Sequence, residues 1–219
     1  MWIPIMAYRE TDTVRARKAA QRAHLLRCAE SLVRDGGFAN LTMQTLAGEA
    51  KVGVGTLYRY FDNKSVLAAE VFRCATEREV AAVAEAMDHD GPFAQRLSHV
   101  LRVFVSRAES APRLAWSLIA EPVDPAVDAE RLLYRRRYAE LYQQFLAEGV
   151  DSGVLPAQDT AISAAAMVGA IAEALVGPLS EPLPRSDLAA SLTQFCLRAV
   201  GMSPAHPIMP QSSSSGENP

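Results

Sequence analysis

Residues 41–64 carry the most distinctive chemistry in the chain and read LTMQTLAGEAKVGVGTLYRYFDNK. Thr42 is a good N-cap for a short helix, and Gly53 can cap a second helix over residues 54–61. Lys51 lies in the tight connection between them. Two short helices joined by a turn of three to four residues predict a helix-turn-helix, whose second helix enters the major groove of DNA.

The two short helices have the residues that their packing needs. Ala47 is small enough for the point where the helices cross, and the inner face carries apolar side chains at Leu46, Ala50, Val52 and Leu57. The turn residue of such a motif is usually glycine, because it adopts left-handed geometry. Lysine in that conformation costs roughly 1–2 kcal/mol. We expect Lys51 to tolerate this cost and to reach a phosphate.

The outward side of the second helix suits contact with DNA. Gly55 lets the backbone approach the duplex, and the hydroxyls of Thr56, Tyr58 and Tyr60 can donate to phosphates. Arg59 can form a bidentate contact with guanine. The alternative is a plain surface hairpin of helices, in which these side chains are only solvated.

This stretch resembles the DNA-binding domain of the TetR family of transcriptional regulators, also called TetR/AcrR. The family pattern is L-T-x-x-x-(L/I)-A-x-x-A-G-V-S-x-G-T-(L/I)-Y-x-Y-F-x-(N/S)-K-x-x-L. The chain departs from it at Lys51, where the family has glycine, and at Gly53, where it has serine. The matching residues are Leu41, Thr42, Leu46, Ala47, Ala50, Val52, Gly55, Thr56, Leu57, Tyr58, Tyr60, Phe61, Asn63, Lys64 and Leu67.

The resemblance implies a homodimeric repressor that binds a palindromic double-stranded DNA operator and is released by a small-molecule effector, without a cofactor. An activator of the same family is one alternative, and a helical small-molecule-binding module without DNA binding is another. By the resemblance, Gln44 and the outward face of the second helix touch bases, and other residues touch the backbone. The expected DNA-binding residues are Thr42, Gln44, Lys51, Gly55, Thr56, Tyr58, Arg59, Tyr60 and Lys64.

Helices must position this segment, because helical periodicity runs through the rest of the chain and no strand pattern bounded by turns is present. Prolines and Gly36-Gly37 divide it into helix-sized intervals, which include 13–35, 93–110, 128–148, 159–177 and 185–200. The sequence therefore predicts an all-α fold of about nine helices. The expected parts are an arm at 1–12, a three-helix DNA-binding domain at 13–62, a ligand-binding and dimerisation body at 63–201 and a disordered tail at 202–219.

Charge and composition agree with a basic binding domain on an acidic body. The 219 residues carry a net charge of −3, but residues 1–65 hold ten basic and six acidic side chains. No P-loop, GxGxxG, GxSxG or HExxH motif is present, which argues against an enzyme and against a metal site. Three widely spaced cysteines and an N-terminus without a signal peptide predict a cytoplasmic protein that starts at Met1 or Met6.

Aromatic residues in the body predict an effector pocket, although ordinary core packing is the alternative for each of them. An apolar cavity with a few polar tips is the usual form of such a site. The run Arg135-Arg136-Arg137 could serve an anionic effector of the acyl-CoA kind, or it is a solvated helix face. The expected pocket residues are Phe104, Trp116, Ile119, Tyr134 and Tyr138.

Small residues near the end of the body predict a dimer interface built from two helices of each subunit. The apolar stretch at 160–179 is long enough to span a membrane, but it is rich in alanine and contains Glu173. It is interpreted as a buried helix with no membrane partner. The expected interface residues are Ala165, Gly169, Ala172, Leu192 and Phe195.

Overall fold

All regular secondary structure in residues 12–180 and 187–202, the residues that the computed structural model describes, is helical. This confirms the predicted all-α class with nine helices in those ranges. The expected N-terminal arm and C-terminal tail lie outside them, except for Asp12, which begins the first helix, and Met202. The helices are α1 (Asp12–Asn40), α2 (Met43–Glu49), α3 (Val54–Leu57), α4 (Lys64–Met87), α5 (Phe93–Ser110), α6 (Pro112–Ile119), α7 (Pro125–Asp151), α8 (Thr160–Ser180) and α9 (Leu188–Ala199).

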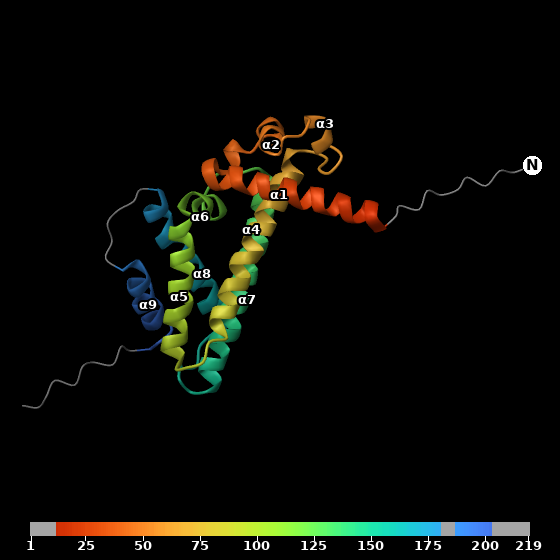
Figure 1. Ribbon diagram of the computed structural model, residues 1–219. Helices are drawn as coiled ribbons and strands as arrows, with labels where there is room; N and C mark the ends of the chain where they lie inside the picture. The colour runs from red at the N-terminus through yellow and green to blue at the C-terminus, as the bar shows by residue number, and fades with distance from the viewer. Residues whose placement is uncertain (1–11, 181–186, 203–219) are drawn as a thin grey trace, which may run out of the picture.

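Helices α1 to α3 gather at one end of the molecule, where the start of α4 joins them (Figure 1). We call this part the head. Its core is continuous, because buried side chains of α1, α2 and α3 meet those of α4. They include Leu25, Ala29, Leu46, Leu57, Leu67 and Phe72.

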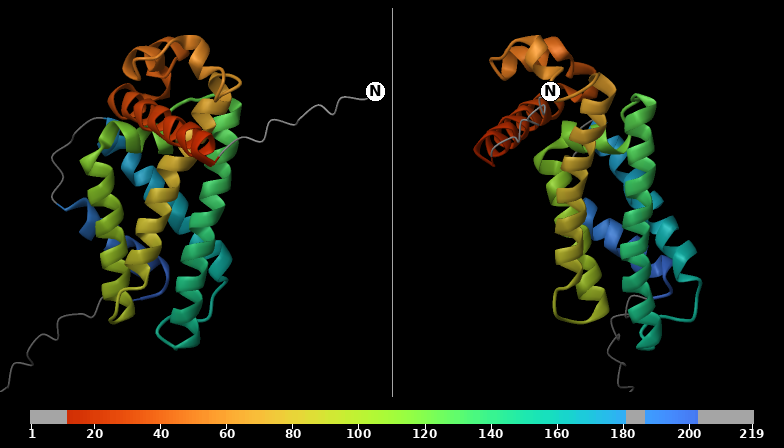
Figure 2. Two further views of the ribbon diagram at one scale, coloured as in Figure 1. Left: turned by 45° about the vertical axis from the view of Figure 1, so that its right-hand side comes forward. Right: turned by 90° about the vertical axis from the view of Figure 1, so that its right-hand side faces the viewer.

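Helices α4, α5 and α7 run lengthwise below the head, with α8 and α9 packed beside them (Figure 2). We call α5 to α9, with the rest of α4, the body. Its core contains Leu97, Leu101, Leu146, Leu175 and Cys196, which are all fully buried. Helix α6 packs against both α1 and α8, so it is a part of the body that borders the head.

Proline and glycine set several boundaries, as the sequence predicts. Pro112 and Pro125 each occupy the first turn of a helix, where the missing N–H has no consequence. Gly37 has a φ of 77° and interrupts α1, and three residues beyond it complete one more helical turn. The predicted end of the first helix at residue 35 is therefore only two residues from this break.

Two expectations about helices are wrong. The second helix of the helix-turn-helix, α3, ends at Leu57 rather than at residue 61. Beyond it, the N–H groups of Arg59 and Tyr60 donate to the carbonyls of Thr56 and Leu57, each three residues back, in the tighter geometry of a 3₁₀ turn. Helix α8 is buried along one side only: Ala164, Met167, Ile171 and Leu175 enter the core, but only 22 % of an 18-residue apolar window of the helix is buried. By length and composition this helix could also cross a membrane, and it is the one such helix in the described ranges.

Candidate DNA-binding surface and effector cavity

Helix α2 is fixed at its start by a reciprocal pair of threonines. The Thr45 N–H donates to Thr42 Oγ1 at 3.0 Å, and the Thr42 N–H donates to Thr45 Oγ1 at 2.9 Å. This capping box satisfies donors that a helix start leaves open. Met43, Leu46 and Ala47 are buried, whereas Gln44 is exposed on the opposite side.

The turn after α2 has the left-handed residue that the sequence predicts. Lys51 has a φ of 53°. Its N–H donates to the carbonyl of Gly48 at 3.2 Å, and the Val52 N–H donates to that of Ala47 at 3.0 Å. These two bonds form a Schellman motif with lysine at the position that glycine usually occupies. The Lys51 side chain is exposed at the surface of the head.

Helix α3 and the turn that follows it, residues 58–60, have a buried and an exposed side. Leu57 is fully buried, whereas Tyr58 is 54 % exposed and Arg59 is exposed beside it. A Cβ at Gly55 would meet nothing within 4 Å, so this position is open to a partner. Arg59 has no ion-pair partner in the described part of the chain.

The other predicted DNA-binding residues occupy the rim of this surface. Thr56 and Tyr60 are half-buried, and the Tyr60 ring also packs against the head core. Asn63 caps α4 by accepting from the Val66 N–H at 2.9 Å, and Lys64 is exposed next to it. The structure thus brings all nine predicted residues to one end of the molecule, around α2 and α3 (Figure 1).

A cavity with about 80 Å³ of internal space lies among α4, α5, α6, α7 and α8. This volume is well below that of the usual small-molecule site, so an effector of ordinary size would have to displace wall side chains to enter. Four of the five predicted pocket residues line it: Phe104, Ile119, Tyr134 and Tyr138. Trp116 does not line it, and the Arg113 guanidinium lies over its ring at 4.7 Å. The lining residues that the sequence prediction missed are Phe72, Thr76, Leu118, Arg131, Arg135, Tyr142, Val168, Ile171 and Ala172.

The cavity wall is mainly apolar but offers a few polar groups. Thr76 Oγ1 is buried and makes no hydrogen bond. Burial and the hydrogen bond to Glu77 raise the pKa of Tyr134 to about 12, and burial also raises the pKa of Tyr138 and Tyr142. These phenols are therefore neutral at physiological pH and can donate hydrogen bonds.

The cavity reaches the surface between α7 and α8. A surface groove there shares Ile119, Arg131, Arg135 and Ala172 with it. Arg131 is held by several carbonyl groups, but Arg135 is exposed and has no ion-pair partner within the described ranges. Arg135 is therefore the cation available at the mouth of the cavity.

The residues expected at a dimer interface divide into two groups. Ala165 and Gly169 are exposed on α8, and Phe195 is 47 % exposed on α9. Ala172 is half-buried and lines the cavity, and Leu192 is only 5 % exposed because it belongs to the core of its own body. The prediction that Leu192 contacts a partner is therefore wrong, since it packs inside its own chain.

Known proteins match the chain in both sequence and fold. Residues 25–71 match the family described as bacterial regulatory proteins, tetR family. An uncharacterised HTH-type transcriptional regulator of Mycobacterium tuberculosis is 29 % identical over 149 residues, which are 66 % of this chain and 68 % of that protein. The match with the family covers most of the head, from the middle of α1 into α4.

Two solved structures have a similar fold over about four fifths of the chain. The fatty acid degradation regulator FadR from Bacillus halodurans superposes with a TM-score of 0.71 at 18 % identity, over 81 % of this chain and 94 % of that one. FadR from Bacillus subtilis, solved in complex with stearoyl-CoA, gives a TM-score of 0.69 at 19 % identity, over 82 % and 97 %. The helix-turn-helix geometry and the family match agree: residues 25–71 form a DNA-binding domain of the tetR family, and the chain is a DNA-binding transcriptional regulator.

Proposed function

We propose that the protein is a homodimeric repressor that binds a two-fold symmetric operator and leaves it when a small molecule fills the body cavity. The observation that supports DNA binding is the arrangement at the end of α3, where Leu57 is buried and the turn that follows exposes Tyr58 and Arg59. We place its action in the cytoplasm, where the DNA is. An activator would use the same contacts, because the sign of regulation depends on where the operator lies relative to the promoter.

In this proposal, contacts to phosphates surround contacts to bases. Lys51 and Lys64 lie on either side of α3 and are exposed, so they suit phosphates of the two strands. Arg59 and Gln44 are the exposed side chains best able to read base edges, as guanine and adenine are read by arginine and glutamine. Tyr58, Tyr60, Thr42 and Thr56 add hydroxyl groups for the backbone.

The dimer is proposed from the face of α8 that the chain leaves uncovered. Ile162 is 68 % exposed, and Ala165 and Gly169 lie along the same helix with small side chains that allow close approach. Phe195 of α9 adds a large apolar side chain to the exposed surface. Exposed apolar patches of this kind mark interaction sites, and a two-fold operator needs two recognition helices.

The proposed effector is an apolar molecule that carries an anionic group. The aromatic and aliphatic wall suits an apolar body, the unbonded Thr76 hydroxyl suits a polar atom on it, and Arg135 at the mouth suits an anion. An acyl-CoA combines these features, and FadR from Bacillus subtilis, which has the same fold, was solved with stearoyl-CoA. Fatty acyl thioesters are therefore the first effector class to test.

Selection from random-sequence DNA, followed by footprinting at two salt concentrations, tests the DNA side. We expect a two-fold symmetric protected site whose affinity falls steeply with salt. Arg59→Ala should weaken operator binding by about 10- to 100-fold, as expected for loss of a bidentate base contact. Arg102→Ala is the matched control, because Arg102 is an exposed arginine of α5 far along the body.

Three outcomes separate the possibilities. Release of the operator by an acyl-CoA supports the repressor proposal in full. Tight binding to the operator that acyl-CoA does not release would support the proposed DNA contacts and exclude this effector class. No binding to any DNA by a folded dimer would overturn the DNA contacts proposed for α2 and α3.

A further inference from the structure

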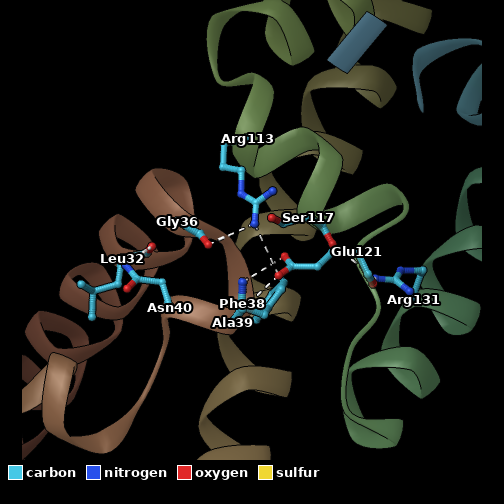
Figure 3. Close-up of polar contacts among 9 residues, drawn as sticks. All are labelled: Leu32, Gly36, Phe38, Ala39, Asn40, Arg113, Ser117, Glu121 and Arg131. Carbon is cyan, nitrogen blue, oxygen red and sulfur yellow. Dashed lines mark hydrogen bonds and ion pairs between the residues drawn. The ribbon is translucent and has the colours of Figure 1, made fainter. Parts of the chain in front are cut away.

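One buried carboxylate of the body holds the backbone of the head at the break in α1. Glu121 follows α6, and its side chain is 5 % exposed. The Phe38 N–H donates to Glu121 Oε2 at 3.0 Å, and the Ala39 N–H donates to Oε1 at 3.1 Å, across more than eighty residues of sequence. Figure 3 shows both bonds entering the same carboxylate.

The break at Gly37 makes this contact possible. Gly37 has a φ of 77° and a ψ of −179°, which redirects the peptide groups that follow it. The N–H groups of Phe38 and Ala39 are thereby offered to a partner outside α1. A Cβ at Gly37 would lie 2.7 Å from both oxygens of Glu121 and 2.4 Å from Arg113, so the site leaves no room for a side chain.

Arg113 completes the contact from α6. Its guanidinium donates to the carbonyl of Gly36 at 3.1 Å and lies 3.7 Å from Glu121 Oε1. The carboxylate therefore accepts from the amides after the break, while the arginine donates to a carbonyl before it (Figure 3). A buried carboxylate needs such a set of partners to be tolerated.

The same short segment forms part of the cavity wall. Leu118 and Ile119 line the cavity and are three and two residues, respectively, before Glu121. Arg131, another wall residue, donates to the carbonyls of Ser117 at 3.2 Å, Leu118 at 3.1 Å and Glu121 at 2.8 Å. The end of α6 and Glu121 are therefore held together as one unit by a side chain that an effector would touch.

We infer that Glu121 is a positioning residue that transmits occupancy of the cavity to the head. An occupant displaces Leu118, Ile119 and Arg131, the Glu121 carboxylate moves with them, and its bonds to Phe38 and Ala39 are broken. The head then loses the orientation in which α3 fits the operator. This mechanism rests on the proposed repressor function and connects the cavity to the head through α1. Coupling of this kind requires that the occupant favour the broken state.

A double-mutant cycle on the full-length chain tests the inference without knowledge of the effector. Ile171→Trp fills the cavity from α8, which does not carry the contact, and Glu121→Gln removes one of the two acceptors. The readouts are amide hydrogen exchange at Phe38 and Ala39 and affinity for the selected operator. We expect each single variant to speed this exchange and weaken operator binding by about tenfold. We expect Ile171→Trp to add almost nothing when Glu121→Gln is present.

The control and the second variant keep the test decisive. Glu148→Gln removes an exposed carboxylate that pairs with Arg96 in the body, and it should change neither readout. If Glu121→Gln does not fold, Gly37→Ala disturbs the same contact from the side of α1. A merely structural role for Glu121 predicts additive effects in the cycle, and additivity would overturn the inference. Absence of DNA binding by the wild type would refute the proposed function. Amide exchange at Phe38 and Ala39 would still show whether filling the cavity breaks their bonds to Glu121.

Discussion

The Tyr134 hydroxyl donates a hydrogen bond to Glu77 Oε1 at 3.0 Å, which joins a wall residue of the cavity to the helix that enters the head. Tyr134→Phe should lower the free energy of unfolding by about 1 kcal/mol, because the phenol makes the bond and the ring only packs. Chemical denaturation measures this. Tyr58→Phe is the control, since Tyr58 is exposed, and it should change stability by less than about 0.5 kcal/mol.

The environment of Tyr134 also predicts how stability depends on alkaline pH. The pKa of Tyr134 rises from 10.0 to about 12, mainly because burial disfavours the phenolate. Its contribution to stability is complete below pH 10 and is lost as pH rises towards 12. The wild type should therefore lose stability more steeply than Tyr134→Phe in this window. Equal slopes would show that the pKa of Tyr134 is not raised in the folded state.

Lys51→Gly separates stability from DNA binding. Glycine accepts the left-handed conformation without strain, so this variant should be more stable by about 1 kcal/mol. It also loses an exposed cation, so binding to any DNA should weaken and its dependence on salt should become shallower. Thermal unfolding and binding at two salt concentrations check the two parts.

Gly153→Ala is the reverse control for Lys51→Gly. Gly153 has a φ of 74° and a Cβ there would touch nothing within 4 Å, so only the backbone strain is introduced. It should lose stability by about 1 kcal/mol and leave DNA binding unchanged. A stable Lys51→Gly that binds DNA as well as the wild type does would remove Lys51 from the proposed contacts.

Thr76→Val tests the unbonded hydroxyl in the cavity wall. Valine has nearly the same shape and removes a buried group without a partner, so the variant should be more stable by about 1 kcal/mol in the absence of ligand. Thr193→Val is the control: Thr193 is also buried, but its hydroxyl donates to the carbonyl of Ala189 at 2.7 Å. Equal effects of the two substitutions would mean that the Thr76 hydroxyl has a partner in solution.

Gly169→Asp tests the proposed dimer face of α8. A charge at this exposed position would be buried against a second copy, so the variant should be a monomer where the wild type is a dimer. Light scattering measures the mass. Ala81→Asp on the exposed side of α4 is the control and should keep the wild-type mass. A dimeric Gly169→Asp would place the interface elsewhere.

Local features of this protein could be predicted from sequence because their causes are local. The spacing of apolar residues and the positions of prolines gave α5 its bounds, Phe93–Ser110, and Asn63 caps α4 as its type and place indicate. Lys51 adopts the left-handed conformation because the turn requires it. The outward residues of α3 followed from the pattern of the helix-turn-helix.

Features that depend on distant parts of the chain could not be predicted in this way. Nothing near Glu121 indicates that its partners are the amides of Phe38 and Ala39. Trp116 was expected in the pocket because it is aromatic, but its ring lies outside the cavity and stacks with the Arg113 guanidinium. Hydropathy also could not show that only one side of α8 is covered by its own chain and that the rest of this apolar helix is exposed.

The cavity in the body has a practical consequence. Residues around an unfilled space lack partners for van der Waals contact, so a fitting occupant stabilises the folded chain. An occupant present at 100 times its dissociation constant adds about 2.7 kcal/mol to the free energy of unfolding. A rise in melting temperature therefore reports binding before any operator is known. Screening compounds by this rise would identify the signal that the regulator senses, and through it the metabolism that the regulator serves.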